Sequence, residues 1–221
     1  MPWVEPDGTQ HIYIMGRNGT GKTQAGMWHL SRQNFAKKTW VMVDTKGEGM
    51  IAQIAKMDGA QVIQLTDTPK KPGLYIVRTL PHQADNGELE NFLYRMWARE
   101  NVGLYFDEGY MVGDSDMFKT LLTQGRSKHI PMIVLTQRPA WITRFAVSEA
   151  SFYQIFWLND AEDRKRIQKF VPYDLDQRLP EYHSLWYDVI RDRVSILKPV
   201  PPRDTILEGF KSQLEVKRVF V

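Results

Sequence analysis

The sequence contains no cysteine, so disulfide bonds, thiolate metal sites and cysteine nucleophiles are all excluded. Its five histidines never fall at the short spacing of a metal-binding pair, which argues against a structural zinc site. Long apolar runs are missing too, since no stretch approaches the roughly 18 residues that a membrane-spanning helix needs. Residues 1–10 carry neither the basic nor the apolar segment of a signal peptide. We therefore expect a cytosolic protein.

The chain also lacks a strong excess of charge. Its 29 lysines and arginines against 26 aspartates and glutamates give a net charge of +3, which is compatible with a polyanionic partner but does not require one. The 221 residues, 43% of them hydrophobic, suffice for one substantial core but not for two ordinary enzymatic domains. We expect one domain over residues 1–203, followed by a helix or arm over residues 204–221.

Short apolar segments rich in β-branched and aromatic residues alternate with longer amphipathic segments. This pattern predicts an α/β fold with a mostly parallel central sheet flanked by helices, and an antiparallel hairpin near the C-terminus. The expected strands are residues 11–15, 40–44, 61–65, 74–79, 102–106, 131–136, 152–158, 182–190 and 194–197. The expected helices are residues 21–35, 49–57, 88–100, 116–125 and 160–170. Asp160 is the expected N-cap of the last helix, and Asp163 holds the position of a capping-box residue.

One motif lies between the first expected strand and the first expected helix. It matches GxxxxGK(S/T) in full with Gly16, Arg17, Asn18, Gly19, Thr20, Gly21, Lys22 and Thr23. The glycines let backbone N–H groups point at a phosphate where side chains would clash. In such loops the lysine bridges the β- and γ-phosphates of ATP, and the hydroxyl after it ligates Mg²⁺. The motif therefore predicts a Mg-ATP site with Lys22 on the phosphates and Thr23 on the metal.

A second motif ends the apolar segment 102–106, which Asp107 and Glu108 follow directly. A buried strand beside the phosphate loop would deliver Asp107 to the Mg²⁺ shell. Glu108 would orient and polarise the water that attacks the γ-phosphate, a role that separates ATPases from nucleotide kinases. A solvated acidic turn is the simpler alternative. Beside a complete phosphate loop, the catalytic interpretation is favoured.

Gln137 and Arg138 follow the apolar segment 131–136. Ligands collect at the carboxyl ends of parallel strands, so this pair is expected beside the γ-phosphate. Gln137 would then sense the γ-phosphate or position the attacking water. Arg138 either contacts phosphate or is an ordinary surface arginine ahead of a proline.

Together these motifs resemble the FtsK/HerA superfamily of DNA-pumping ATPases, and within it the small genome-packaging ATPases of tailless icosahedral viruses with an internal membrane. The resemblance rests on HIYIMGRNGTGKT, VMVDTKGEG, VGLYFDE and GRSKHIPMIVLTQRP, in that order. The second segment resembles the D-x-K-x-E pattern of these enzymes, here Asp44, Lys46 and Glu48.

This resemblance implies a RecA-like P-loop core that assembles as a homo-oligomeric ring, expected to be a hexamer, and moves double-stranded DNA without sequence specificity. It also implies a location in the host cytoplasm or the virion, with capsid-vertex or membrane proteins as further partners. A P-loop ATPase often needs an arginine from a neighbouring subunit. Arg126 is our catalytic candidate for that arginine, with Arg144 as the alternative.

Contacts to a DNA backbone need only lysines and arginines, so no spacing rule identifies them. One candidate group is Lys70 and Lys71 in a proline-flanked loop. The other is the late helix with Arg164, Lys165, Arg166 and Lys169, although a charged helix is usually a solvated face. The tryptophans expected in the core are Trp28, Trp97, Trp141, Trp157 and Trp186.

Two other functions stay open on the sequence. A nucleotide-gated assembly protein would use slow hydrolysis to switch protein contacts, and it needs the same site as a motor. A P-loop small-molecule kinase is less favoured, because the Asp107–Glu108 pair and the Gln137 strand argue against it.

Overall fold

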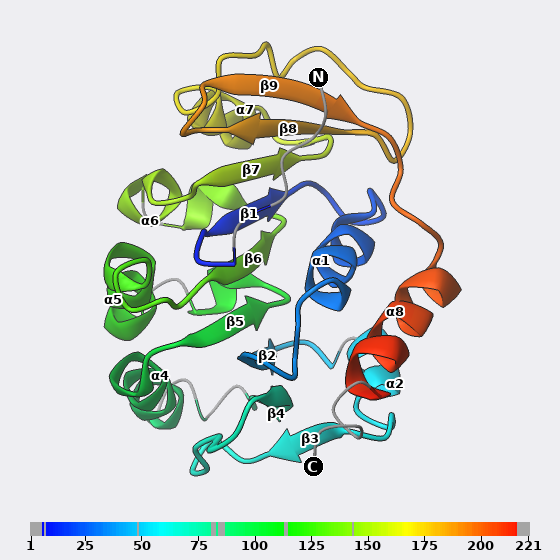
Figure 1. Ribbon diagram of the computed structural model, residues 1–221. Helices are drawn as coiled ribbons and strands as arrows, with labels where there is room; N and C mark the ends of the chain where they lie inside the picture. Colours follow the sequence, from blue (N-terminus) through cyan, green and yellow to red (C-terminus); the bar gives the residue numbers. More distant parts are fainter. Residues whose placement is uncertain are drawn as a thin grey trace.

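One central sheet organises the molecule (Figure 1). The structure, a computed structural model, describes residues 6, 8–47, 49–80, 83, 87–112, 115–142 and 144–215. Its strands are β1 (Ile12–Met15), β2 (Thr39–Asp44), β3 (Ala60–Ile63), β4 (Gly73–Arg78), β5 (Val102–Phe106), β6 (Met132–Thr136), β7 (Phe152–Ile155), β8 (Ser184–Asp188) and β9 (Arg193–Leu197). They form a nine-stranded sheet in the order β3-β4-β2-β5-β6-β1-β7-β8-β9.

The pairing of the strands confirms the predicted mixed sheet. All neighbours from β3 to β7 pair in parallel, and β8 pairs antiparallel with both β7 and β9. The expected C-terminal hairpin is therefore β8 and β9. Because β1, β2, β5 and β6 run the same way, the residues that follow them meet at one edge of the sheet.

Helices cover both faces of the sheet. The helices are α1 (Lys22–Ser31), α2 (Gly49–Ile54), α4 (Glu88–Arg99), α5 (Asp116–Gln124), α6 (Arg144–Ser148), α7 (Ala161–Ile167) and α8 (Arg203–Glu215), with the short 3-10 helices η1 (Gly109–Val112) and η2 (Pro139–Trp141). Figure 1 shows α1, α2 and α8 on one face and α4, α5 and α6 on the other. Among the residues that the structure describes, no helix is long and apolar enough to cross a bilayer.

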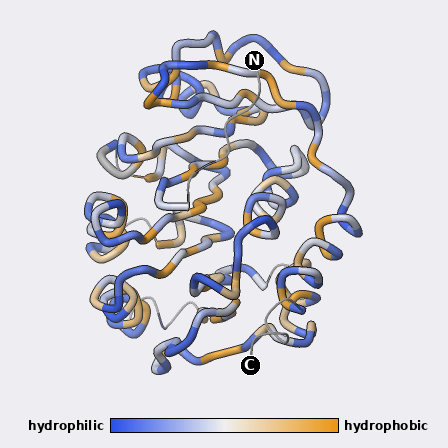
Figure 2. The backbone as a smooth tube through the Cα atoms, in the orientation of Figure 1, coloured by the Kyte–Doolittle hydropathy of each residue, from blue (hydrophilic) through white to orange (hydrophobic). Residues whose placement is uncertain are grey.

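Each face of the sheet has its own hydrophobic core, which explains why the central strands read as continuous apolar runs. Along β1, Tyr13 and Met15 pack into the core under α4 and α5, while Ile12 and Ile14 pack into the core under α1 and α8. Every residue of β1, β2, β5, β6, β7 and β8 is buried. In Figure 2 the central strands accordingly contain many residues coloured as hydrophobic.

Gly103 in the middle of β5 allows a tryptophan of the core to pack. A Cβ at this position would lie 2.3 Å from Cδ2 of Trp40, whose ring is fully buried on the neighbouring strand β2. The absence of a side chain at Gly103 therefore lets the indole of Trp40 lie close to the backbone of β5.

Several element ends differ from the sequence prediction, and two of the differences have a clear local reason. The first helix ends at Ser31, because the Asn34 side chain accepts hydrogen bonds from the backbone N–H groups of Ala36 and Lys37 and turns the chain. Strand β7 ends at Ile155, because the carbonyl of Trp157 accepts a 2.9 Å hydrogen bond from Arg17 N instead of pairing within the sheet.

The C-terminal segment forms α8, whose apolar residues Ile206, Phe210 and Leu214 are buried in the same core as α1. The ring of Phe210 stacks on Phe35 with centroids 6.1 Å apart. Helix α8 is thus packed along its apolar side onto the face of the sheet that α1 covers.

The expectation for the tryptophans holds only in part. Trp186 is buried, and Trp28 and Trp97 pack against the two cores from partly buried positions. Trp157 is half-buried. The expectation is wrong for Trp141, which is 61% exposed and lies under the guanidinium of Arg138, 4.7 Å from its carbon to the ring centroid.

His11, directly before β1, is a buried histidine held in its neutral form. Its Nδ1 accepts a hydrogen bond from Met132 N at 3.1 Å, and its Nε2 lies 3.0 Å from the carbonyl oxygen of Leu122. Protonation would put a second N–H on Nδ1, facing the N–H of Met132. Burial lowers the pKa of His11 to about 4; the charge of Arg126 acts in the same direction, and the Leu122 hydrogen bond opposes it.

We predict that this histidine makes the fold sensitive to acid. Its pKa is lower in the folded chain than in the unfolded one, so its contribution is complete above about pH 6.5 and is lost as the pH falls towards about 4. The shift corresponds to about 3 kcal/mol of unfolding free energy. Urea titrations across this range should show a shallower pH dependence for His11→Gln than for the natural chain. Identical pH dependence of the two proteins would contradict the prediction.

Candidate nucleotide site

The loop between β1 and α1 carries the glycine-rich motif, and its conformation requires the glycines. Gly19 and Gly21 have φ angles of 76° and 100°, in the left-handed region that side chains disfavour. Gly16 is buried, and a Cβ there would lie 2.6 Å from Cβ of Phe156. The loop connects the end of β1 to the N-terminus of α1. Backbone N–H groups at a helix N-terminus are free to bind an anion.

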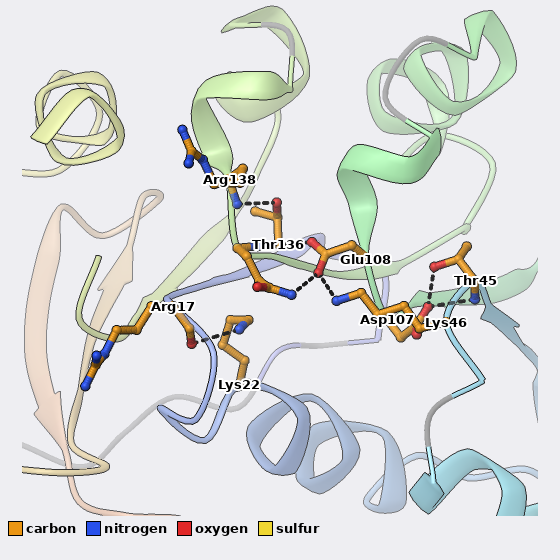
Figure 3. Close-up of polar contacts among 9 residues, drawn as sticks. Arg17, Lys22, Thr45, Lys46, Asp107, Glu108, Thr136 and Arg138 are labelled. Carbon is orange, nitrogen blue, oxygen red and sulfur yellow. Dashed lines mark hydrogen bonds and ion pairs between the residues drawn. The ribbon is translucent and has the colours of Figure 1, made fainter. Parts of the chain in front are cut away.

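Lys22 is the first residue of α1, and its side chain folds back over the loop. Its Nζ donates a 3.0 Å hydrogen bond to the carbonyl of Arg17, which also accepts from Thr20 Oγ1 at 2.8 Å. The side chain of Arg17 points away from Lys22 (Figure 3). Asn18 is exposed and Thr23 is half-buried.

Asp107 lies beyond β5, where Thr45 holds one of its oxygens. The backbone N and Oγ1 of Thr45 donate to Asp107 Oδ1 at 2.9 and 2.8 Å. Asp107 Oδ2 is buried and has no hydrogen-bond partner within the described residues. An oriented carboxylate oxygen without a donor suits a hard cation. No group of three or more His, Asp or Glu in the described ranges could hold a metal alone, so further ligands would have to come from a substrate or water.

Glu108 is wholly buried, and donors from two neighbouring loops hold its carboxylate (Figure 3). Gln137 donates from its backbone N to Oε1 at 3.0 Å and from its Nε2 to Oε2 at 2.9 Å. Lys46 Nζ forms an ion pair with the same Oε2. Lys46 follows β2 and Gln137 follows β6, the two strands that flank β5 in the sheet. A buried carboxylate is tolerated only with such partners.

Burial shifts the pKa values of two charged groups of the site in opposite directions. It lowers the pKa of Lys22 to about 8; the Glu108 charge opposes this shift and the Lys46 charge adds to it. Burial raises the pKa of Asp107 to about 6, although the two hydrogen bonds from Thr45 favour its charged form. Perturbed values of this kind are typical of functional sites.

Arg138 connects the site to α7. Its guanidinium forms ion pairs with Asp160 at 3.2 Å and with Asp163 at 3.3 Å, and it points away from Lys22 and Glu108 (Figure 3). Asp160 is the N-cap of α7, as predicted, and accepts from Glu162 N. Asp163 does not complete a capping box, because its Oδ1 accepts instead from Ala140 N at 2.8 Å.

The structure brings Lys22, Asp107, Glu108 and Gln137 to one edge of the sheet, as expected from their strands. Arg126 lies elsewhere, exposed in the turn between α5 and β6. The length of β6, roughly 16 Å at about 3.3 Å per residue, separates Arg126 from Gln137 of the same chain. Thr45 was not among the predicted site residues. The available signal was its position directly after the buried strand β2. Glu48 lies outside the described residues.

No protein-family model matches the sequence. The chain is 44% identical over 216 residues to the DNA packaging ATPase P9 of Enterobacteria phage PRD1, and the match covers 93% of each protein. The genome packaging NTPase B204 of Sulfolobus turreted icosahedral virus 2, solved in complex with ATP-gammaS, has a TM-score of 0.69 at 18% identity and covers 89% of this chain and 100% of its own.

A second solved structure of similar fold is EssC (ATPases 2 and 3) from Geobacillus thermodenitrificans. It has a TM-score of 0.64 at 13% identity and covers 96% of this chain but 45% of its own. The fold, the phosphate loop after β1 and the Asp–Glu pair after β5 define the class of P-loop ATPases. Within that class, the chain belongs to the DNA packaging ATPase family that includes P9 of phage PRD1. The resemblance to genome-packaging ATPases is thereby confirmed.

We predict that Lys46 and Glu108 are energetically coupled. In Lys46→Met the buried carboxylate of Glu108 keeps only the hydrogen bonds from Gln137. In the double variant, Lys46→Met with Glu108→Gln, the carboxylate charge is removed as well. Because the Lys46 side chain is 36% exposed, we expect about 1–3 kcal/mol of lost stability for Lys46→Met, less than for a fully buried pair. Urea unfolding of the two single variants and the double variant measures the coupling.

A surface pair provides the control for this cycle. Lys119→Met removes the partner of Asp116, whose side chain is 92% exposed, and should cost less than Lys46→Met. Additive effects of Lys46→Met and Glu108→Gln, within about 0.5 kcal/mol, would show that the pair is not coupled.

Proposed function

We propose that this protein is an ATP-hydrolysing motor that translocates double-stranded DNA and packages a viral genome into a preformed capsid. The observation that carries the proposal is the 44% identity to a DNA packaging ATPase across 93% of the chain. The site supports it, because the chain has a phosphate loop, an oriented aspartate and a buried glutamate at one sheet edge.

In the proposed mechanism the loop from Gly16 to Thr23 holds the phosphates of ATP, with Lys22 on the β- and γ-phosphates. Thr23 and Asp107 Oδ2 would hold Mg²⁺, which supplies charge neutralisation of the phosphates. Glu108 acts on the attacking water, and Gln137 positions that water or senses the γ-phosphate. The hydrogen bonds between Gln137 and Glu108 support a shared role for the two side chains.

The proposed motor is a homo-oligomeric ring, expected to be a hexamer. Arg126 is exposed and lies at the amino-terminal end of β6, away from the nucleotide site of its own chain. A catalytic role for Arg126 is therefore compatible only with the site of a neighbouring subunit, as a trans arginine requires. Arg144, the alternative, lies over the ring of Phe170 with its guanidinium carbon 5.9 Å from the centroid.

The structure separates the two groups of candidate DNA contacts. Lys165 and Lys169 are exposed and line one hollow together with Arg144, Arg166 and the half-buried Phe170; Glu162 is the one carboxylate among its lining residues. Arg164 is engaged elsewhere, since it pairs with Asp176 and donates to the carbonyls of Leu158 and Asn159.

We name the group of Arg144, Lys165, Arg166 and Lys169 the basic hollow. The basic hollow lies beside η2. Asp163 of α7 is ion-paired with Arg138, the residue that follows Gln137. Lys70 and Lys71 precede β4, at the sheet edge opposite the nucleotide site. We therefore assign the DNA backbone to the basic hollow. The motor would act in the host cytoplasm or at the virion, with capsid-vertex or membrane proteins as further partners.

The first test is the steady-state ATPase rate with and without double-stranded DNA. We expect duplex DNA to raise the rate several-fold at low salt and moderate salt to remove the gain, because backbone contacts release counterions. Lys22→Ala should abolish turnover by weakening nucleotide binding. Glu108→Gln should abolish turnover while nucleotide still binds, which a fluorescent ATP analogue measures. Turnover indifferent to DNA would favour an assembly switch, and turnover only with an added small acceptor would favour a kinase.

The second test compares two charge reversals of equal size. Lys165→Glu combined with Lys169→Glu should lower duplex DNA affinity at least about tenfold and reduce the salt dependence of binding. Lys70→Glu combined with Lys71→Glu is the matched control and should change affinity far less. Fluorescence anisotropy of a labelled duplex measures both. A larger loss for the Lys70 and Lys71 pair would move the DNA surface to the opposite edge of the sheet.

A further inference from the structure

A cavity of about 350 Å³ adjoins the phosphate loop, and Glu108 is not among the residues that line it. Gly19 and Thr20 of the loop form one wall, and the segment that leads into β8 forms the other. Figure 1 shows this segment passing close to the loop between β1 and α1. The volume lies at the lower end of the roughly 300–1,000 Å³ typical of small-molecule pockets.

Two aromatic rings of the cavity lie against the start of α1. Measured from a Cβ position built at Gly21, Phe156 Cε1 is 3.5 Å away and Tyr182 Cδ1 is 3.6 Å away. A side chain at Gly21 would thus enter the space between the phosphate loop and these rings. The rings and the cavity therefore lie directly against the loop to which the proposed function assigns the phosphates.

Tyr182 differs from ordinary surface tyrosines. It is 47% exposed although it borders the cavity, and its φ of 58° places a bulky residue in the left-handed region. Such a conformation is retained only where the surroundings or a function hold it. The flanking turn, closed by the hydrogen bond from His183 N to the carbonyl of Pro180, presents the ring at the cavity.

Trp157 also borders the cavity, but its ring is already in use. The guanidinium carbons of Arg164 and Arg178 lie 5.0 and 5.2 Å from its ring centroid. Its backbone carbonyl binds Arg17 N of the phosphate loop. Trp157 therefore supports the loop. Of the other aromatic residues that line the cavity, Phe156 is buried and Tyr173 is half-buried, so Tyr182 offers the most exposed ring.

We propose that this cavity binds the base of the nucleotide, with Tyr182 stacking on the base. The inference rests on the proposed function, since it needs the phosphates in the loop from Gly16 to Thr23. Stacking is sequence-tolerant because every base has a π-face, and its strength is set by the aromatic partner. Tyr182 would therefore contribute to the affinity for nucleotides but not to the affinity for phosphate chains without a base.

The test compares binding of AMP-PCP with binding of inorganic tripolyphosphate, each with Mg²⁺, by calorimetry. Tyr182→Asn removes the ring while keeping a residue that tolerates the left-handed conformation. We expect it to weaken AMP-PCP about tenfold, the loss typical of one base–aromatic stack, and tripolyphosphate less than about twofold. Tyr182→Phe should bind both as the natural chain does. Tyr94→Ala, at an exposed tyrosine on α4, is the control and should change neither.

Two outcomes would overturn the base pocket. If Tyr182→Asn leaves AMP-PCP binding unchanged, the base lies elsewhere. If it weakens both ligands equally, or if Tyr182→Phe fails to restore AMP-PCP binding, Tyr182 supports the loop and does not stack on a base. In both cases the ATPase of the natural chain would persist. If the natural chain binds neither ligand, the phosphate site itself is wrong, and the proposed function fails with it.

Discussion

The wholly buried carboxylate of Glu108 dictates how the strands around it are arranged. A charge without solvent needs donors on every side, and they come from Lys46 after β2 and Gln137 after β6. These three residues meet because β2, β5 and β6 end within two residues of one another. The parallel register supplies this, since Phe106 of β5 is paired with Val43 of β2 and with Val134 of β6. The buried charge and the sheet order therefore constrain each other.

The same arrangement links the site to the rest of the molecule. Gln137 holds both oxygens of Glu108, and the next residue, Arg138, is ion-paired with Asp163 of α7. Asp163 in turn accepts the backbone N–H of Ala140 in η2. A change in the contacts of Glu108 thus has a short covalent and ionic route to α7, which carries Lys165 and Arg166 of the basic hollow. Under the proposed function, this route would couple ATP binding and hydrolysis at Glu108 to the affinity of the basic hollow for DNA.

Local patterns in the sequence predicted the fold and the phosphate loop, whereas contacts distant in the chain were not predictable. Strands buried on both faces read as unbroken apolar runs, and the loop is one continuous segment. The bonds from Thr45 to Asp107 and from Lys46 to Glu108 each span 62 residues, so no spacing rule finds them. Trp141 was misplaced because hydrophobicity alone ignores a guanidinium such as that of Arg138, which covers its exposed ring.

The opposite pKa shifts of Lys22 and Asp107 show what kind of ligand the site suits. Both shifts arise mainly from burial, which disfavours the charged form of each group. A ligand of one charge would relieve only one of them, because an anion favours the ammonium and a cation favours the carboxylate. A polyphosphate that carries a divalent cation supplies both partners at once. Under the proposed function, a metal-bound nucleotide would therefore relieve the burial of both charges, which neither component alone would do.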